Sequence, residues 1–325
     1  MMKTSVKFHD LAVSEESFET AVLTGFARSR KALPCKFLYD ARGSQLFDEI
    51  CRLPEYYPTR TEIGILADRA PEVAQLMGPG VQLVELGSGS SRKIRLLLDL
   101  LQDVSCYVPV DISSEHLRLA AEAVADDHPG IPVAAICADY TADFELPAAL
   151  QGGFAKRVAF FPGSTIGNLM PEEALMLLRS CWRLVGRGGD MLVGVDLVKD
   201  DAVLNAAYND ASGVTAQFNL NLLERINREL GGDFDLGRFA HVAFFNRAES
   251  RMEIYIESLV TQLVRIAGHG FRLNAGERIH TEYSYKYTID GFRALARSAG
   301  WTPVETWTDP AALFSVHYLR RSGTA

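Results

Sequence analysis

The stretch that decides the fold is Val84-Glu85-Leu86-Gly87-Ser88-Gly89-Ser90-Ser91, which closes a short apolar run at residues 81–86. This run predicts a strand, and the glycine- and serine-rich turn leads into a helical pattern at residues 91–101. A dinucleotide-binding turn, G-x-G-x-x-G, would carry its third glycine where Arg92 stands. The bulk of Arg92 would obstruct close helix–strand packing, which disfavours a nicotinamide dehydrogenase. A nucleotide-like ligand without a pyrophosphate fits the turn better.

Short apolar runs and helical patterns alternate on both sides of this turn. The expected strands are 107–110, 133–138, 157–161, 191–195, 302–307 and 314–319. The expected helices are 61–77, 115–125, 171–184 and 288–298. Such alternation predicts an α/β fold with a mostly parallel sheet. Two prolines bracket Tyr56-Tyr57, so we expect a loop or turn at residues 54–60.

The alternation stops between residues 199 and 286, which indicates a second, discontinuous domain. Residues 201–230 have helical spacing, and two strand-like runs follow at 251–259 and 261–266. We therefore expect a cofactor-binding core at residues 61–198 and 287–325. The second domain, expected to bind the substrate, would comprise residues 1–60 and 199–286.

Acidic residues end the two strands that follow the glycine turn. Asp111 stands where a carboxylate can accept both hydroxyls of a ribose, about twenty residues beyond the turn. Asp139 could reach an adenine amino group, and Tyr140 could lie along the ring. The alternative is that these aspartates only cap helices, as Asp often does after a strand. Together with Gly87 and Gly89, the pattern favours S-adenosylmethionine, with S-adenosylhomocysteine as its product.

The composition restricts the cellular compartment and the classes of partner that we expect for this chain. A formal net charge of -8 disfavours nucleic-acid and anionic-membrane partners, which select basic surfaces. No apolar run approaches the roughly 20 residues that span a bilayer, and the N-terminus lacks the apolar stretch of a signal peptide. Five scattered cysteines without metal-ligand spacing indicate a reducing compartment. We expect a cytoplasmic protein with a small-molecule substrate, and no metal site among its seven histidines.

A set of longer motifs makes the sequence resemble one family, the histidine-specific S-adenosylmethionine-dependent methyltransferases. The motifs run in family order through nearly the whole chain: Phe37-Leu38-Tyr39-Asp40-Ala41-Arg42-Gly43-Ser44, Leu53-Pro54-Glu55-Tyr56-Tyr57-Pro58-Thr59-Arg60-Thr61-Glu62, Pro162-Gly163-Ser164-Thr165-Ile166-Gly167-Asn168-Leu169, Asp196-Leu197-Val198-Lys199-Asp200, Gly213-Val214-Thr215-Ala216-Gln217-Phe218-Asn219 and Glu282-Tyr283-Ser284-Tyr285-Lys286. The resemblance implies a class I methyltransferase with a Rossmann-like sheet. It also implies methylation of the α-amino group of L-histidine, three times, to the betaine used for ergothioneine. We expect a monomer.

The resemblance assigns site residues position by position. It places the cofactor against Tyr39, Gly87, Lys93, Asp111, Asp139 and Tyr140. It places histidine against Tyr56, Gly163, Asn168, Tyr208, Glu282 and Ser284. Tyr39 and Asn168 are the residues expected nearest the reacting amine. On residue type alone, other roles stay open: a core aromatic for Tyr39, a turn residue for Asn168 and a surface charge for Glu282.

Chemistry supports the expected imidazole contacts. A neutral imidazole offers one donor and one acceptor, which match an accepting Glu282 and a donating Ser284. The two residues are two apart, so an extended segment places both on one face. The family often has methionine beside the imidazole, where this chain has Ile254 in Met252-Glu253-Ile254. This difference leaves room for another amino acid such as tryptophan, and a non-catalytic binding protein on the same fold is a further alternative.

Overall fold

The computed structural model describes residues 6–11, 17–89, 92–142 and 144–323. Ser90 and Ser91 of the glycine turn lie outside these residues. The chain divides into two compact units. The first comprises Met1–Val13, Pro58–Val198 and Lys286–Ala325, and the second comprises Ser14–Tyr57 and Lys199–Tyr285. Each unit is described by itself.

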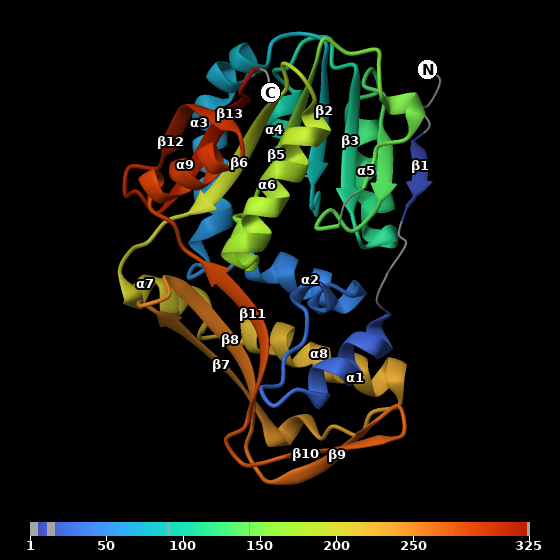
Figure 1. Ribbon diagram of the computed structural model, residues 1–325, viewed down its shortest axis with the longest axis vertical. Helices are drawn as coiled ribbons and strands as arrows, with labels where there is room; N and C mark the ends of the chain where they lie inside the picture. The colour runs from blue at the N-terminus through green and yellow to red at the C-terminus, as the bar shows by residue number, and fades with distance from the viewer. Residues whose placement is uncertain (1–5, 12–16, 90–91, 143, 324–325) are drawn as a thin grey trace. The chain divides into compact units, whose positions relative to one another are not determined.

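The first unit is built on a large sheet, and its described strands follow the order β1-β4-β3-β2-β5-β6-β13-β12 (Figure 1). Their bounds are β1 Lys7–Asp10, β2 Val81–Leu86, β3 Cys106–Asp111, β4 Ala134–Cys137, β5 Lys156–Phe161, β6 Asp190–Asp196, β12 Trp301–Thr308 and β13 Phe314–Arg321. Pairing is parallel from β1 to β6. The last two strands are antiparallel, with β13 inserted between β6 and β12. The strand order reverses between β2 and β5, so this is where ligands bind in such sheets.

Helices cover both faces of this sheet because its strands are apolar on both sides. The bounds are α3 Tyr57–Met77, α4 Arg92–Leu98, α5 Ser114–Asp127, α6 Pro171–Val185 and α9 Ile289–Ser298. Side chains of α6 and α9 pack with Val84 and Leu86, while those of α3, α4 and α5 pack with Val81 and Leu83. Alternate residues of β2 therefore point to opposite cores. Within the described ranges, no helix combines the length and apolar character needed to cross a membrane.

The second unit joins four helices to two small antiparallel sheets in its described part (Figure 1). The helices are α1 Phe18–Ala27, α2 Ala41–Ile50, α7 Asp201–Ala207 and α8 Val214–Leu230. One sheet has the order β11-β8-β7 and the other pairs β10 with β9. Their bounds are β7 Phe239–Asn246, β8 Arg251–Ser258, β9 Gln262–Ile266, β10 His269–Leu273 and β11 Arg278–Tyr285. Short 3₁₀ turns complete the two units: η1 Cys35–Leu38, η2 Ala148–Leu150, η3 Thr165–Asn168 and η4 Leu236–Arg238.

Two local expectations were wrong. Residues 54–60 were expected to be a loop, yet α3 begins at Tyr57. Pro58 lies in its first turn, where a missing backbone N–H costs no helical hydrogen bond. Residues 1–60 were expected in the second domain, yet β1 pairs with β4 in the large sheet. That pairing assigns Met1–Val13 to the first unit. The chain returns to the first unit at Lys286, whose ammonium pairs with the buried carboxylate of Asp196 at 2.7 Å.

Gly64 gives a direct test of helix α3. It is an exposed residue inside the helix, and a Cβ built on it meets no atom within 4 Å. Gly64→Ala is expected to raise the free energy of unfolding by about 0.5–1 kcal/mol, because alanine loses less backbone entropy on folding. Urea unfolding followed by circular dichroism measures the change. Gly25→Ala is the contrasting helical variant and should destabilise, since its Cβ would lie 2.1 Å from the Ala32 carbonyl oxygen.

Candidate functional site

The glycine turn after β2 has a backbone that only glycine adopts easily. Gly87 and Gly89 have φ values of 70° and 45°, and the Gly87 N–H donates to the Val110 carbonyl at 2.8 Å. A Cβ on Gly87 would lie 3.5 Å from the Tyr140 hydroxyl oxygen. Between the glycines, the buried Ser88 hydroxyl has no hydrogen-bond partner in the described chain. This turn therefore combines close backbone access with a polar group that a ligand could satisfy.

The two expected acidic residues stand beyond neighbouring strands. Asp111 ends β3, and its carboxylate accepts the N–H of Ser113 at 2.9 Å and of Gly89 at 3.4 Å. Burial raises the pKa of Asp111, and these backbone donors partly oppose that rise. Asp139 follows β4 and accepts the backbone and side chain of Thr141. Asp111 is thus joined directly to the glycine turn, whereas Asp139 accepts from Thr141, two residues further along the chain.

Lys93 and Gly163 are brought together by Glu62, a residue that the sequence did not predict for the site. Glu62 lies on α3 and is fully buried. Its Oε2 lies 2.5 Å from Lys93 Nζ, and its two oxygens accept the Gly163 N–H at 3.1 and 2.9 Å. Gly163 has φ 83°, and a Cβ there would lie 3.4 Å from Lys93 Nζ. A lone glutamate in a helical stretch carries no sign of burial, so this link is visible only in the fold.

Asn168 and Gly163 belong to the first unit, although both were expected among the substrate-binding residues. They lie on the segment after β5, where Ser164 adopts the left-handed conformation and η3 ends at Asn168. The Ser164 hydroxyl accepts the Asp196 backbone N–H at 2.8 Å, which ties this segment to β6. Asn168 is half-buried, and its place at the end of η3 fits both a turn role and a binding role.

Glu85 provides a pH-dependent test of the core below the glycine turn. Burial raises the pKa of Glu85 to about 8. The hydrogen bond that the Tyr107 hydroxyl donates to Glu85 lowers the pKa, but by less than burial raises it. Between about pH 5 and 8, the folded chain keeps a proton on Glu85 that the unfolded chain has lost. Stability from this group therefore falls as pH rises, by at most about 1.4 kcal/mol per pH unit. Glu85→Gln should remove that slope in unfolding experiments from pH 5 to 8.

The exposed Glu305 on β12 supplies the control for this experiment. Glu305→Gln should leave the pH profile of the wild type unchanged. Parallel profiles for the wild type and Glu85→Gln would contradict the assignment of the slope to Glu85.

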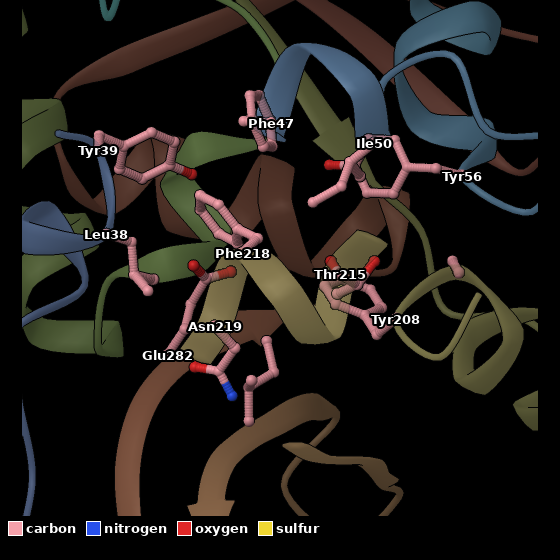
Figure 2. A pocket seen from close by; sticks show the side chains of 12 residues that line it. Leu38, Tyr39, Phe47, Ile50, Tyr56, Tyr208, Thr215, Phe218, Asn219 and Glu282 are labelled. Carbon is pink, nitrogen blue, oxygen red and sulfur yellow. The ribbon is translucent and has the colours of Figure 1, made fainter. Parts of the chain in front are cut away.

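The second unit contains a pocket (Figure 2). Its lining comes from η1, α2, α7, α8, β8 and β11 and the short segments beside them. The lining residues are Leu38, Tyr39, Phe47, Ile50, Tyr56, Ala207, Tyr208, Thr215, Phe218, Asn219, Ile254 and Glu282. The pocket thus brings together five of the predicted residues, Tyr39, Tyr56, Tyr208, Ile254 and Glu282.

Aromatic rings form much of the pocket wall (Figure 2). The ring of Tyr39 makes edge contacts with Phe47 and Phe218, at centroid distances of 5.5 and 5.4 Å. Tyr56 makes edge contacts with Phe47 at 6.2 Å and with Tyr208 at 6.3 Å. Burial, with smaller effects of Tyr208 and other neighbours, raises the pKa of Tyr56 well above its usual value. Tyr56 therefore remains a neutral phenol that can donate a hydrogen bond.

Strands β8 and β11 place the polar part of the pocket. Glu282 and Ser284 lie two apart on β11, and Glu282 is directly opposite Ile254 on β8. Glu282 is 9% exposed, and the Tyr208 hydroxyl donates to the Ser284 hydroxyl at 2.9 Å. Tyr283, between them, packs instead on His280 and Arg251. The pocket therefore sets one carboxylate in a wall that is otherwise largely aromatic and aliphatic.

Tyr39 is held through the residue that follows it. Asp40 caps α2 by accepting the Gly43 N–H at 2.7 Å. Its carboxylate also accepts from Asn221 at 2.8 Å and pairs with Arg228 at 2.5 Å, both on α8. These contacts join η1 and α2 to α8 and so fix the chain on which Tyr39 stands.

Helix α8 supplies three lining residues that the sequence did not single out as site residues, Thr215, Phe218 and Asn219. They are spaced as one face of a helix. Their positions lie in the quoted motif at residues 213–219, which was the only available signal. Helical spacing alone cannot distinguish a pocket wall from ordinary core.

Comparisons with known proteins bear on the family and on the fold. A family model described as "Histidine-specific methyltransferase, SAM-dependent" matches residues 18–321. The chain is 42% identical over 306 residues to a histidine N-alpha-methyltransferase of Mycolicibacterium smegmatis, covering 93% of this chain and 94% of that protein. It is 31% identical over 303 residues to ergothioneine biosynthesis protein 1 of Neurospora crassa, covering 90% of this chain and 33% of that protein. The solved structure of the CcbJ methyltransferase from Streptomyces caelestis matches with a TM-score of 0.51 and 15% identity, over 88% of this chain and 100% of that chain. This last likeness confirms the expected α/β methyltransferase fold.

Proposed function

Because this chain belongs to the histidine-specific, SAM-dependent methyltransferase family, we propose that it methylates the α-amino group of L-histidine. The methyl donor is S-adenosylmethionine, and each transfer releases S-adenosylhomocysteine. The observation that carries the proposal is the carboxylate of Glu282 in an otherwise largely apolar pocket. A carboxylate there matches the N–H of an imidazole ring, whereas an apolar amino-acid side chain would leave it without that partner.

The first unit supplies groups that fit S-adenosylmethionine. Asp111 offers a carboxylate for ribose hydroxyls, and the turn at Gly87 and Gly89 admits a ligand close to the backbone. The unpartnered hydroxyl of Ser88 offers a further polar contact. We assign cofactor-binding roles to these residues and to Lys93, Asp139 and Tyr140, with Tyr39 as a further candidate from the second unit. When bound, S-adenosylmethionine supplies a methyl group on a positively charged sulfur.

The pocket residues meet the main requirement of this reaction, which is a neutral amine. Methyl transfer forms an N–C bond from the amine lone pair and breaks the S–C bond, whose electron pair returns to sulfur. A protonated amine has no lone pair to give, and loss of hydration between the aromatic walls lowers the pKa of the amine and so favours its neutral form. Neutral Tyr56 and the hydroxyl of Tyr208 can orient polar atoms of the amino acid. Asn168 and Tyr39 remain our candidates for contact with the reacting amine.

The same aromatic walls support repeated transfer. Each methylation yields a cationic ammonium, which loses a proton before the next transfer. The faces of tyrosine and phenylalanine attract methylated ammonium groups, and Tyr39, Phe47, Tyr56 and Phe218 line the pocket. We therefore propose three transfers that end at histidine betaine. We further place this product in ergothioneine biosynthesis, the process named for the Neurospora crassa relative.

Calorimetry and mass spectrometry test the proposed function. L-Histidine, L-tryptophan and other free amino acids are titrated into the protein with and without S-adenosylhomocysteine, and turnover mixtures are then weighed by mass spectrometry. We expect histidine to gain up to three methyl groups. Tryptophan belongs in the panel because Ile254 faces Glu282 across β8 and β11. Binding of the cofactor product without any methylated amino acid would overturn the proposal.

A further inference from the structure

Asn219 of α8 is a buried pocket residue whose amide is held on one side. It is 2% exposed and lies on the pocket wall with Glu282 (Figure 2). Its Nδ2 donates to the Tyr255 carbonyl oxygen at 2.9 Å and contacts His241 Nδ1 at 3.0 Å. A backbone carbonyl only accepts, so the amide nitrogen, and not the oxygen, must face Tyr255.

His241 fixes the same orientation independently. Its Nε2 lies 2.9 Å from the Tyr208 carbonyl oxygen, which also only accepts, so Nε2 carries a proton. Burial lowers the pKa of His241, although the hydrogen bond to Tyr208 and the charge of Asp210 oppose this. In the neutral ring Nδ1 is then an acceptor, and it needs the donor that Asn219 provides. Two carbonyl groups, at Tyr208 and Tyr255, therefore determine which way the amide points.

The consequence is an unsatisfied acceptor on a residue that lines the pocket. Both hydrogens of Asn219 Nδ2 are committed, and its Oδ1 has no hydrogen-bond partner among the described residues. Buried polar atoms are nearly always partnered in native proteins. An unpartnered amide oxygen on a residue of the pocket wall is best explained by a donor that arrives with the ligand.

We propose that Asn219 Oδ1 accepts a ring N–H of the bound amino acid, and that His241 is the positioning residue that keeps this oxygen available. The proposal rests on the proposed function, since it takes the ligand to be an amino acid with an N–H-bearing ring. The two acceptors, the carboxylate of Glu282 and the amide oxygen of Asn219, then bind the imidazolium form of the ring, which carries two N–H groups and whose charge Glu282 balances. Asn219 thereby becomes a specificity-determining residue.

A pair of ligands isolates this contact. L-Histidine carries ring N–H groups, whereas β-(2-thienyl)-L-alanine has a five-membered aromatic ring of similar size with no N–H. Both are titrated by calorimetry in the presence of S-adenosylhomocysteine. Asn219→Leu keeps the approximate volume but removes the acceptor. We expect this variant to bind histidine at least about tenfold more weakly than the wild type does, and its affinity for thienylalanine to change by less than about twofold.

Two further variants keep the test decisive if Asn219→Leu does not fold, as judged by circular dichroism. Asn219→Ala removes the same acceptor with a smaller side chain and should lower the preference for histidine in the same way. His241→Phe removes the group that orients the amide, so the preference for histidine should fall. Asn227→Ala is the matched control, because Asn227 lies on the same helix and bonds only Phe234 at its far end. It should leave the preference unchanged.

The outcomes separate this inference from the function on which it rests. Equal weakening of both ligands by Asn219→Leu or by Asn219→Ala would overturn the role of Asn219. Unchanged histidine binding by Asn219→Leu would do the same. A wild-type protein that does not bind histidine would instead overturn the proposed function.

Discussion

Replacing Glu282 with alanine is expected to weaken L-histidine binding about a hundredfold while leaving the affinity for S-adenosylhomocysteine unchanged. Glu282 is 9% exposed and lines the pocket of the second unit. A hydrogen bond between a ring N–H and a buried carboxylate is stronger than one between neutral groups. Alanine leaves that N–H without a partner, so the ligand loses both the bond and the compensation for its lost hydration. Calorimetry with each ligand measures the two affinities.

Two variants sharpen this test. Glu282→Gln keeps an acceptor oxygen but removes the charge, so an intermediate loss is expected. Glu257→Ala is the control, because Glu257 lies on β8 of the same sheet and pairs with exposed Arg278. It should change histidine binding by less than about twofold. Histidine binding that survives Glu282→Ala unchanged would remove Glu282 from the binding site.

The second large effect is expected from a single methyl group at Gly194. Gly194 lies inside β6, and a Cβ there would stand 1.9 Å from Glu62 Oε1. The carboxylate of Glu62 would have to leave its place, which breaks its pair with Lys93 and its bonds to Gly163. Displacing one partner of a buried ion pair costs about 3–5 kcal/mol. Gly194→Ala should therefore lower the free energy of unfolding by that amount and weaken S-adenosylhomocysteine binding.

A double variant distinguishes this mechanism from general strain in β6. Glu62→Ala removes the carboxylate that collides with the new methyl group. The double variant Gly194→Ala with Glu62→Ala should then lose clearly less free energy of unfolding than the two single variants lose together, because both substitutions act on one contact. Denaturant unfolding of the four proteins measures this coupling. Additive losses would show that Gly194 is required for another reason.

The sequence predicted the repeating part of the fold well, because each strand and helix of the first unit has its own apolar pattern. β1 was missed because a four-residue strand, Lys7–Asp10, gains its stability from pairing with distant β4. β7 was missed because it is mostly half-buried along its length, which leaves no clear alternation. The loop expected around Pro58 followed the general cost of proline in helices and overlooked its tolerance in a first turn.

The residues of the site likewise divide into those that could be proposed from the sequence and those that could not. Residues in distinctive motifs, such as Gly87 and Glu282, could be proposed from the sequence, and the structure shows where each lies. Glu62 and Asn219 also stand in quoted motifs, but nothing in those motifs marked them as site residues, because their importance comes from burial and from partners that are remote in sequence. A helical glutamate or asparagine is ordinary until the fold encloses it. Hydrogen-bond accounting in three dimensions was needed to identify both.

The position of β13 has a consequence for how the protein is made. β13, residues Phe314–Arg321, lies between β6 and β12, so β12 reaches the rest of the sheet only through it. During translation, β6 therefore keeps an unpaired edge while residues 197–313, which include the larger part of the second unit, α9 and β12, emerge. Unpaired strand edges invite aggregation. Newly synthesised chains should therefore depend on chaperones until residue 321 has left the ribosome, and premature termination anywhere before β13 should yield aggregates rather than a partly active enzyme.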